Sequence, residues 1–221
     1  ARAFSKIKKM KQPAITAADS KQKKPRHLFF YKETEQSHLV LGMHGLSRTA
    51  PERYALALLH IILGANMSSR LYEEVREKRG LAYEIRSGIN FYEDAGSFTV
   101  SAGVENSKVA QTVALVLAQL SQVCERGIRE GELARAKEYF LNQFYFALED
   151  TLDHMLWLGD KALYHKEIPT REQIRNRIEA VSAGALQALA RRIFRTNNLN
   201  LVIIGPLAAS QQEIIRKRCC L

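Results

Sequence analysis

The spacing of apolar residues changes along this chain, and the order of the changes constrains its fold more than any other feature. Between residues 85 and 104, apolar and polar side chains alternate in two runs joined by the turn sequence Glu93-Asp-Ala-Gly96. This pattern predicts a β-hairpin. Because serine and threonine hold alternate positions, one face of the sheet should be covered and the other polar or wet. From Ser107 onward, apolar residues instead recur at helical spacing.

Shorter patterns predict the remaining strands. Runs of β-favouring residues indicate strands at 28–31, 37–44 and 199–204, the last strongly apolar and central in its sheet. Strands and helices are largely segregated along the chain. That order predicts an α+β fold with one mostly antiparallel sheet and helices packed on one face.

Helix starts are marked by capping sequences. Thr49, followed by proline and glutamate, predicts the start of the helix over 54–63, and Thr170-Arg-Glu-Gln173 forms a capping box that opens a later helix. Further helices are predicted from Ser68 or Ser69 to Lys78, over 109–120, 133–148 and 152–164, and from Ser182.

Positive charge is concentrated at the start of the chain. The 221 residues carry a net charge of +10, but residues 1–26 hold nine lysines and arginines against one aspartate, which leaves only +2 for the other 195. This segment lacks apolar periodicity, so we expect a basic linker or tail over 1–26. The domain should cover 27–207, followed by a C-terminal helix or tail over 208–221. Because the chain starts without methionine, we expect it to be part of a longer precursor.

Several function classes find little support. A nucleic-acid binder is suggested only by the net charge, which lies mostly outside the domain. No glycine-rich phosphate loop is present, and no histidine belongs to a His-x-x-Glu-His or His-Glu-x-x-His motif. The longest apolar stretch, 54–63, is shorter than the roughly 20 residues that span a membrane, so we expect a soluble chain. Three cysteines, two of them adjacent, give neither a disulfide framework nor a metal-binding spacing.

The best candidate for a metal site in this chain is the acidic cluster of Glu149, Asp150, Asp153 and His154. Asp150 and His154 would share one helix face. A solvated helix junction has the same composition, and we favour that interpretation. We likewise expect His60, inside an apolar helix, to be a hydrogen-bonded core residue. The sequence therefore predicts no metal site of its own.

The segment from Asn66 to Tyr83 stands out chemically. Arg76 lies near the end of a predicted helix, Gly80 permits a turn, and Tyr83 begins the next strand. The two side chains can converge, presenting a guanidinium and a phenol that suit a carbonyl oxygen gaining negative charge. On spacing alone a structural interpretation is stronger: a basic helix end that satisfies terminal carbonyls, then a tyrosine packed at the sheet rim.

This segment also resembles a known family. Residues 67–83 are similar to the signature in the second homologous half of the pitrilysin/insulinase family of inverted-motif zinc peptidases, and the element order over 27–206 is similar to one whole repeat of that family. The resemblance implies two α+β halves around a chamber, the first carrying His-x-x-Glu-His. It also implies that Arg76 and Tyr83, seven residues apart, match the family's pair that contacts the substrate carbonyl near the zinc. Two departures are that Gly64-Ala65-Asn66 replaces a glycine-rich run and that the zinc motif is missing.

The resemblance thus implies a function divided between two halves. This chain would be the C-terminal half of a zinc metalloendopeptidase, inactive alone, with Arg76 and Tyr83 as catalytic and substrate-binding residues. The zinc would lie on an N-terminal partner half, in the same precursor or a separate subunit, and peptide or unfolded protein would be the substrate. The alternative is a catalytically inactive family repeat used for assembly or protein–protein interaction. The compartment, cytoplasmic or periplasmic, is left open.

Overall fold

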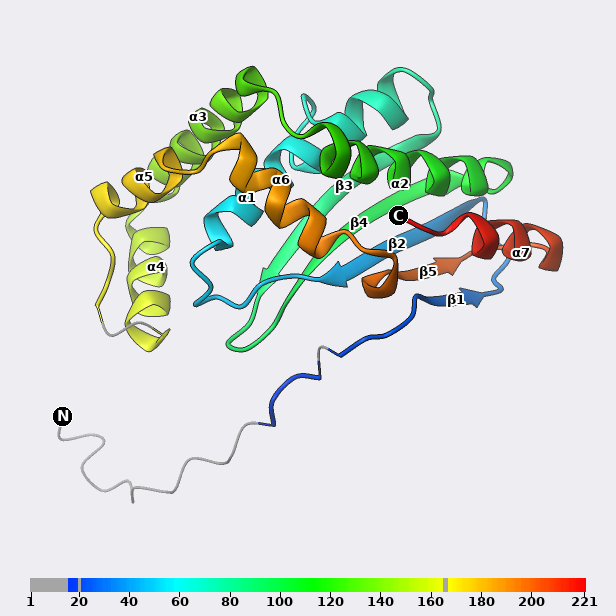
Figure 1. Cartoon of the computed structure of the whole chain (residues 1–221), viewed down its shortest axis with the longest axis horizontal. Helices are drawn as coiled ribbons and strands as arrows, with labels where there is room; N and C mark the ends of the chain where they lie inside the picture. The colour runs from blue at the N-terminus through cyan, green and yellow to red at the C-terminus, as the bar shows by residue number, and fades with distance from the viewer. Residues whose placement is uncertain (1–15, 20, 165–166) are drawn as a thin grey trace.

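The computed structural model describes residues 16–19, 21–164 and 167–221, and most of the basic segment predicted at 1–26 lies outside them. A five-stranded mixed sheet has helices along one side (Figure 1). Its strands lie in the order β1, β5, β2, β4, β3. Their bounds are β1 (Arg26–Phe30), β2 (Gln36–His44), β3 (Ala82–Phe91), β4 (Gly96–Glu105) and β5 (Asn200–Ile204).

The pairing of these strands confirms the predicted α+β class. β1 is parallel to β5, and the other three neighbouring pairs are antiparallel. β3 and β4 form the predicted hairpin, closed by the Tyr92 amide donating to the Ala95 carbonyl at 2.9 Å. β5 is interior, but β2 and not β5 occupies the centre of the sheet.

Ten helical segments accompany the sheet in the described part of the chain. The capping box opening α5 is confirmed, because the Thr170 hydroxyl accepts from the Gln173 amide at 3.1 Å and Gln173 Oε1 accepts from the Thr170 amide at 2.9 Å. The predicted Thr49 cap is wrong: α1 begins at Arg53, and the Thr49 hydroxyl instead lies 3.3 Å from that of Ser47. The bounds are α1 (Arg53–Gly64), η2 (Tyr72–Glu77), η3 (Asn106–Lys108), α2 (Val109–Arg126), α3 (Glu130–Ala147), α4 (Thr151–Tyr164), α5 (Arg171–Glu179), α6 (Ala183–Ile193), η4 (Thr196–Asn198) and α7 (Ala209–Arg218).

The core lies between one face of the sheet and the helices. Alternate strand residues such as Leu41 and Val100 are fully buried against residues of α1, α2 and α6, and each such side chain contributes about 1.5–3 kcal/mol by leaving water. On the opposite face, Val40 and Ile204 remain 42% and 40% exposed. The predicted covered face is therefore confirmed, whereas the open face, predicted to be polar or wet, also carries exposed apolar side chains.

His60 joins α1 to β3 through a partly buried polar contact. Its Nδ1 lies 2.7 Å from the Ser87 hydroxyl, which donates in turn to the His60 carbonyl at 3.1 Å. A neutral ring with its proton on Nδ1 satisfies both contacts, because Nδ1 then donates to the hydroxyl while the hydroxyl donates to the carbonyl. Close packing surrounds this pair, since a Cβ on Gly64 would lie 2.5 Å from the Ser87 nitrogen. His60 is thus a hydrogen-bonded core histidine, as predicted.

The burial of His60 makes stability depend on pH. Burial lowers the pKa of His60 below its ordinary 6.5, so the folded state favours the neutral ring. The stabilisation is complete above pH 6.5 and is lost as the pH falls through the lower pKa of the folded state. Denaturant titrations should therefore show a smaller free energy of unfolding at pH 5 than at pH 7.5.

The His60→Asn variant is the matched control. Asparagine keeps a nitrogen near the position of Nδ1 but does not titrate, so its loss of stability between the two pH values should be smaller. Burial also lowers the pKa of His27, which accounts for some remaining dependence. Equal losses in both proteins would contradict the role of His60.

Candidate active-site corner

Arg76 and Tyr83 meet where η2 gives way to β3. The Arg76 Cζ atom lies 5.4 Å from the centre of the Tyr83 ring and 4.8 Å from that of Tyr72, so the guanidinium contacts two aromatic rings. We did not identify Tyr72 from the sequence. Its position four residues before Arg76 was the available signal, because that spacing places two side chains on one helix face.

The Arg76 guanidinium keeps its donors available. Its Nε is 4.0 Å from Glu77 Oε1, a long and exposed ion pair. Within the described residues, neither the guanidinium nor the Tyr83 hydroxyl makes a hydrogen bond. Tyr83 is 77% exposed. The corner therefore presents, side by side, a guanidinium and a phenol whose hydrogen-bond donors make no hydrogen bond to the described residues.

The helix that carries Arg76 winds more widely than the sequence predicted. Residues 72–77 form a π-helix, in which the Lys78 amide donates to the carbonyl of Glu73, five residues back, at 2.9 Å. Periodicity had predicted an ordinary α-helix here. Such π-helical turns are rare and frequently occur at functional sites.

Gly80 ends this helix with a turn that satisfies its carbonyls. Its φ of +56° lies in the left-handed region, and its amide donates to the Arg76 carbonyl at 3.0 Å. The Leu81 amide donates to the Val75 carbonyl at 2.9 Å. These backbone hydrogen bonds satisfy the terminal carbonyls of the helix, a role that the structural interpretation had assigned to the Arg76 side chain.

A β-bulge determines where Tyr83 points. Ala82 pairs with Val104 and Glu84 with Gly103, which leaves Tyr83 as the extra residue in β3. In a regular strand, Tyr83 would share the covered face with Ile85, because the two are separated by two positions. The bulge instead leaves Tyr83 exposed, and bulges are known to redirect side chains near active sites.

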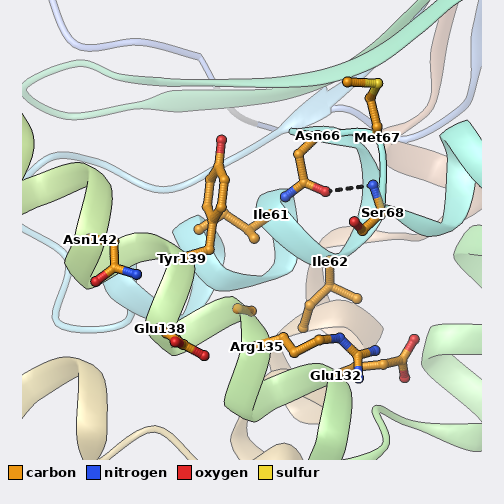
Figure 2. Close-up of a pocket in the computed structure, with 11 residues that line it drawn as sticks. Ile61, Ile62, Asn66, Met67, Ser68, Glu132, Arg135, Glu138, Tyr139 and Asn142 are labelled. Atoms are coloured by element: carbon orange, nitrogen blue, oxygen red, sulfur yellow. Dashed lines mark hydrogen bonds between the residues drawn. The ribbon is translucent and has the colours of Figure 1, made fainter.

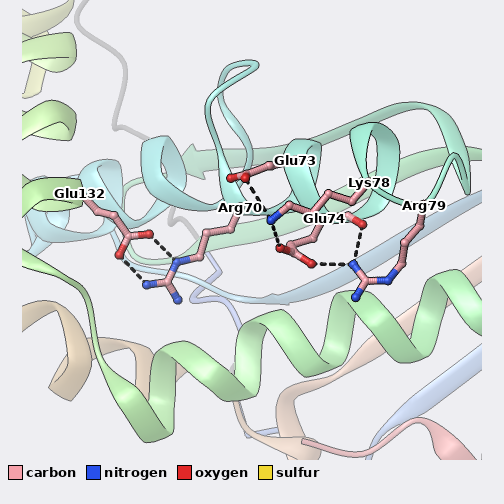
Figure 3. A network of polar contacts seen from close by, with 6 residues as sticks. All are labelled: Arg70, Glu73, Glu74, Lys78, Arg79 and Glu132. Atoms are coloured by element: carbon pink, nitrogen blue, oxygen red, sulfur yellow. Dashed lines mark hydrogen bonds and ion pairs between the residues drawn. The ribbon is translucent and has the colours of Figure 1, made fainter.

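An ion pair fixes the corner segment to α3 (Figure 3). Arg70 donates from Nε and Nη2 to the two carboxylate oxygens of Glu132 at 2.8 and 2.7 Å, and from Nη2 to the Gly127 carbonyl at 3.2 Å. The two side chains are only 16% and 18% exposed. Although burial alone would raise the pKa of Glu132, hydrogen bonds from Arg70 and the Arg129 amide hold that pKa below its ordinary value.

A second network occupies the other cations of the segment. Lys78 donates to Glu74 at 2.7 Å and pairs with Glu73 at 3.0 Å, and Arg79 also binds Glu74 (Figure 3). Hydrogen bonds from Lys78 and Arg79 lower the pKa of Glu74. The carboxylates of Glu73 and Glu74 are therefore engaged away from Arg76.

A cavity of about 470 Å³ lies beside the start of the same segment, between the end of α1 and α3 (Figure 2). Ile61, Ile62 and Tyr139 supply apolar walls, and Asn66 Oδ1 accepts from the Ser68 amide at 3.0 Å at its rim. Neither Arg76 nor Tyr83 lines it. The cavity and the corner are separate features.

The described residues contain no group of three histidines, cysteines, aspartates or glutamates placed to hold a metal ion. In the acidic cluster considered from the sequence, Asp150 Oδ1 accepts from the amides of Leu152 and Asp153 at 2.8 and 3.0 Å, which makes it the cap of α4. The His154 ring lies against Trp157 at 6.2 Å. None of the described helices combines the length and apolar character needed to cross a membrane.

Comparisons with known proteins point to one family. The family model of the peptidase M16 inactive domain matches residues 1–140. An uncharacterized zinc protease of Streptomyces coelicolor is 37% identical over 180 residues, which cover 81% of this chain and 39% of that protein. The uncharacterized zinc protease YmxG of Bacillus subtilis is 35% identical over 175 residues, or 79% of this chain and 42% of that protein. The chain thus spans about two fifths of these relatives.

The fold is shared with solved structures. A protease from Helicobacter pylori superimposes with a TM-score of 0.83 at 22% identity, and the match covers 93% of this chain and 51% of that one. At this identity the likeness concerns the fold alone. It places the same arrangement of sheet and helices in a chain about twice as long.

The turn at Gly80 gives a first test of the corner. Alanine at a φ of +56° is strained, so Gly80→Ala should lower the free energy of unfolding by about 1–2 kcal/mol. Gly159→Ala is the control, because Gly159 lies within α4 and an added Cβ meets nothing within 4 Å. That change should raise stability by about 0.5–1 kcal/mol. Denaturant unfolding that gave both changes the same sign would contradict this account of Gly80.

The Arg70–Glu132 pair gives a second test. Glu132→Gln removes a partly buried charge that binds Arg70, and it should lower the free energy of unfolding by about 1–3 kcal/mol. Glu74→Gln removes a similar charge from a more exposed network and should cost less. Denaturant unfolding of both variants measures the difference, and an equal or larger loss in Glu74→Gln would refute it.

Proposed function

The chain belongs to the peptidase M16 family as an inactive domain, and from this premise we propose that it supplies Arg76 and Tyr83 to a zinc endopeptidase whose metal lies on a partner half. The pitrilysin-like family predicted from residues 67–83 is the family found. The observation that carries the proposal is the Arg76 guanidinium, which makes only a long ion pair and no hydrogen bond to the described residues, beside the exposed Tyr83 phenol. Peptide or unfolded protein is the proposed substrate.

The two side chains suit a carbonyl that gains charge. Arg76 carries a permanent positive charge and several donors, and Tyr83 adds a neutral donor. Hydrogen bonds from both to a peptide carbonyl oxygen strengthen as that oxygen becomes negative, which lowers the barrier to hydrolysis. The zinc on the partner would supply Lewis-acid chemistry.

The surroundings of Arg76 restrict the position of its guanidinium before substrate arrives. The Tyr72 and Tyr83 rings confine the guanidinium, and the Arg70–Glu132 ion pair fixes the start of the helix. Fixed donors contribute more to catalysis than mobile ones, because they need no reorganisation during the reaction. Tyr83 also lies on β3, one of the two edge strands of the sheet, where an extended peptide can approach the backbone.

The test uses this chain together with the zinc-binding half encoded with it, assayed on a peptide substrate. Arg76→Ala and Tyr83→Phe should each lower kcat by about 10²- to 10³-fold, because each removes a donor to the developing oxyanion. Tyr72→Phe is the matched control: it removes the same hydroxyl from the neighbouring ring but keeps the contact with Arg76, so kcat should stay unchanged.

Two results would refute the proposal. If Tyr83→Phe left kcat unchanged, the phenol would have no part in the reaction. If the unaltered complex bound zinc and still cleaved nothing, the role of an inactive repeat used for assembly would be the better account.

A further inference from the structure

A polar cavity of about 260 Å³ lies between η2, the end of α2 and the start of α3. Charged or amide side chains supply all of its lining except Gly127, and neither Arg76 nor Tyr83 reaches it. Its volume exceeds the roughly 30 Å³ that one water occupies but is smaller than the pockets of about 300–1,000 Å³ that hold drug-sized ligands. A polar molecule of few heavy atoms would therefore fill it.

Gln119 of α2 is the deepest side chain in this lining. It is only 5% exposed, and its amide makes no hydrogen bond to the described residues. The four other buried polar side chains in the described part of the chain each make at least one hydrogen bond; they are Ser37, Ser69, Ser87 and Thr112. Because a buried amide without a partner lowers stability, the exception at Gln119 indicates a partner that comes from outside the chain.

The cavity also has positive charge to spare. The carboxylates in its lining are those of Glu73, Glu74 and Glu132, and each is held by a cation of the corner segment (Figure 3). Arg126 and Arg129 line the cavity as well, and neither forms an ion pair within the described residues. Two guanidiniums are thus left for an anion.

The helical spacing of α2 directs its donors toward the same space. Gln119, Gln122 and Arg126 stand at i, i+3 and i+7, which places them along one helix face, and all three line the cavity. A basic residue in the last turn of a helix is ordinary, so Arg126 alone would not indicate a site. The row that runs from a buried, unpartnered amide to a guanidinium does, because such donors together suit an oxyanion.

We propose that this cavity binds a small dicarboxylate. The two guanidiniums of Arg126 and Arg129 match its two charges, and each can bind a carboxylate through a pair of parallel hydrogen bonds. The Gln119 and Gln122 amides add neutral donors and satisfy themselves at the same time. Phosphate also binds arginine, but it is more compact than this cavity requires. The site is separate from the Arg76–Tyr83 corner and does not depend on the proposed function.

The experiment measures binding to the full chain of 221 residues. The chain is labelled with ¹⁵N and titrated with succinate at pH 7 and constant ionic strength, and NMR follows the Gly127 backbone amide and the Gln119 side-chain amide. Both signals should shift and saturate with a Kd on the order of 1 mM. Arg126→Ala and Arg129→Ala should each raise this Kd about tenfold, because each removes a charged donor.

Two further variants make the test specific. Arg177→Ala is the matched control: Arg177 is an exposed arginine of α5 outside the cavity, so the Kd should not change. Gln119→Leu removes the amide at similar volume, so the Kd should rise. Because leucine needs no hydrogen bond, this variant should also unfold at a higher temperature than the unaltered chain when no ligand is present.

Several results would overturn the proposal. Shifts that grow linearly with succinate and never saturate would show that no site exists. An equal loss of affinity in Arg177→Ala would reduce the effect to general attraction between opposite charges. Tighter binding of inorganic phosphate than of succinate would overturn the assignment of a dicarboxylate. A lower unfolding temperature for Gln119→Leu without ligand would show that the amide is already satisfied within the chain.

Discussion

Burial of a single face of the sheet is the constraint on which the rest of the structure depends. Helices α1, α2 and α6 cover that face, and the side chains of Leu41 and Val100 on it are fully buried. In the described part of the chain the close packing is on this one side, which leaves the other face and the edge strand β3 open to contacts. The corner that holds Arg76 and Tyr83 lies at this edge, next to the packed layer of sheet and helices.

The distribution of charge in the corner segment explains why Arg76, alone among its cations, makes only a long ion pair. Arg70 is bound by Glu132, and the Glu73 and Glu74 carboxylates hold Lys78 and Arg79. A segment rich in both signs usually neutralises itself at the surface. Here the wide helical turn directs Arg76 between two aromatic rings, which attract a cation without removing its hydrogen-bond donors.

The periodicity of apolar residues predicted most of the fold. It failed where one extra residue is inserted into a regular helix or strand. The hairpin, the core histidine His60 and the cap at Thr170 all follow from regular spacing and local chemistry. The π-helical turn and the bulge at Tyr83 each insert a residue into a regular element, so no repeating pattern marks them. The meeting of Arg76 with Tyr83 was expected, but the contact with Tyr72 depends on the winding and was missed.

The bulge at Tyr83 also makes the orientation of this side chain independent of the register of the core residues that follow it. In an unbroken β3, the orientation of residue 83 would be tied to the core register of Ile85, and any slip would move both. Because one extra residue stands between Ala82 and Glu84, the alternation of inward and outward side chains starts again after the exposed tyrosine. The length of the chain between Gly80 and Ile85 therefore matters more than the identity of most residues in it, and a single-residue deletion there would turn the phenol toward the core.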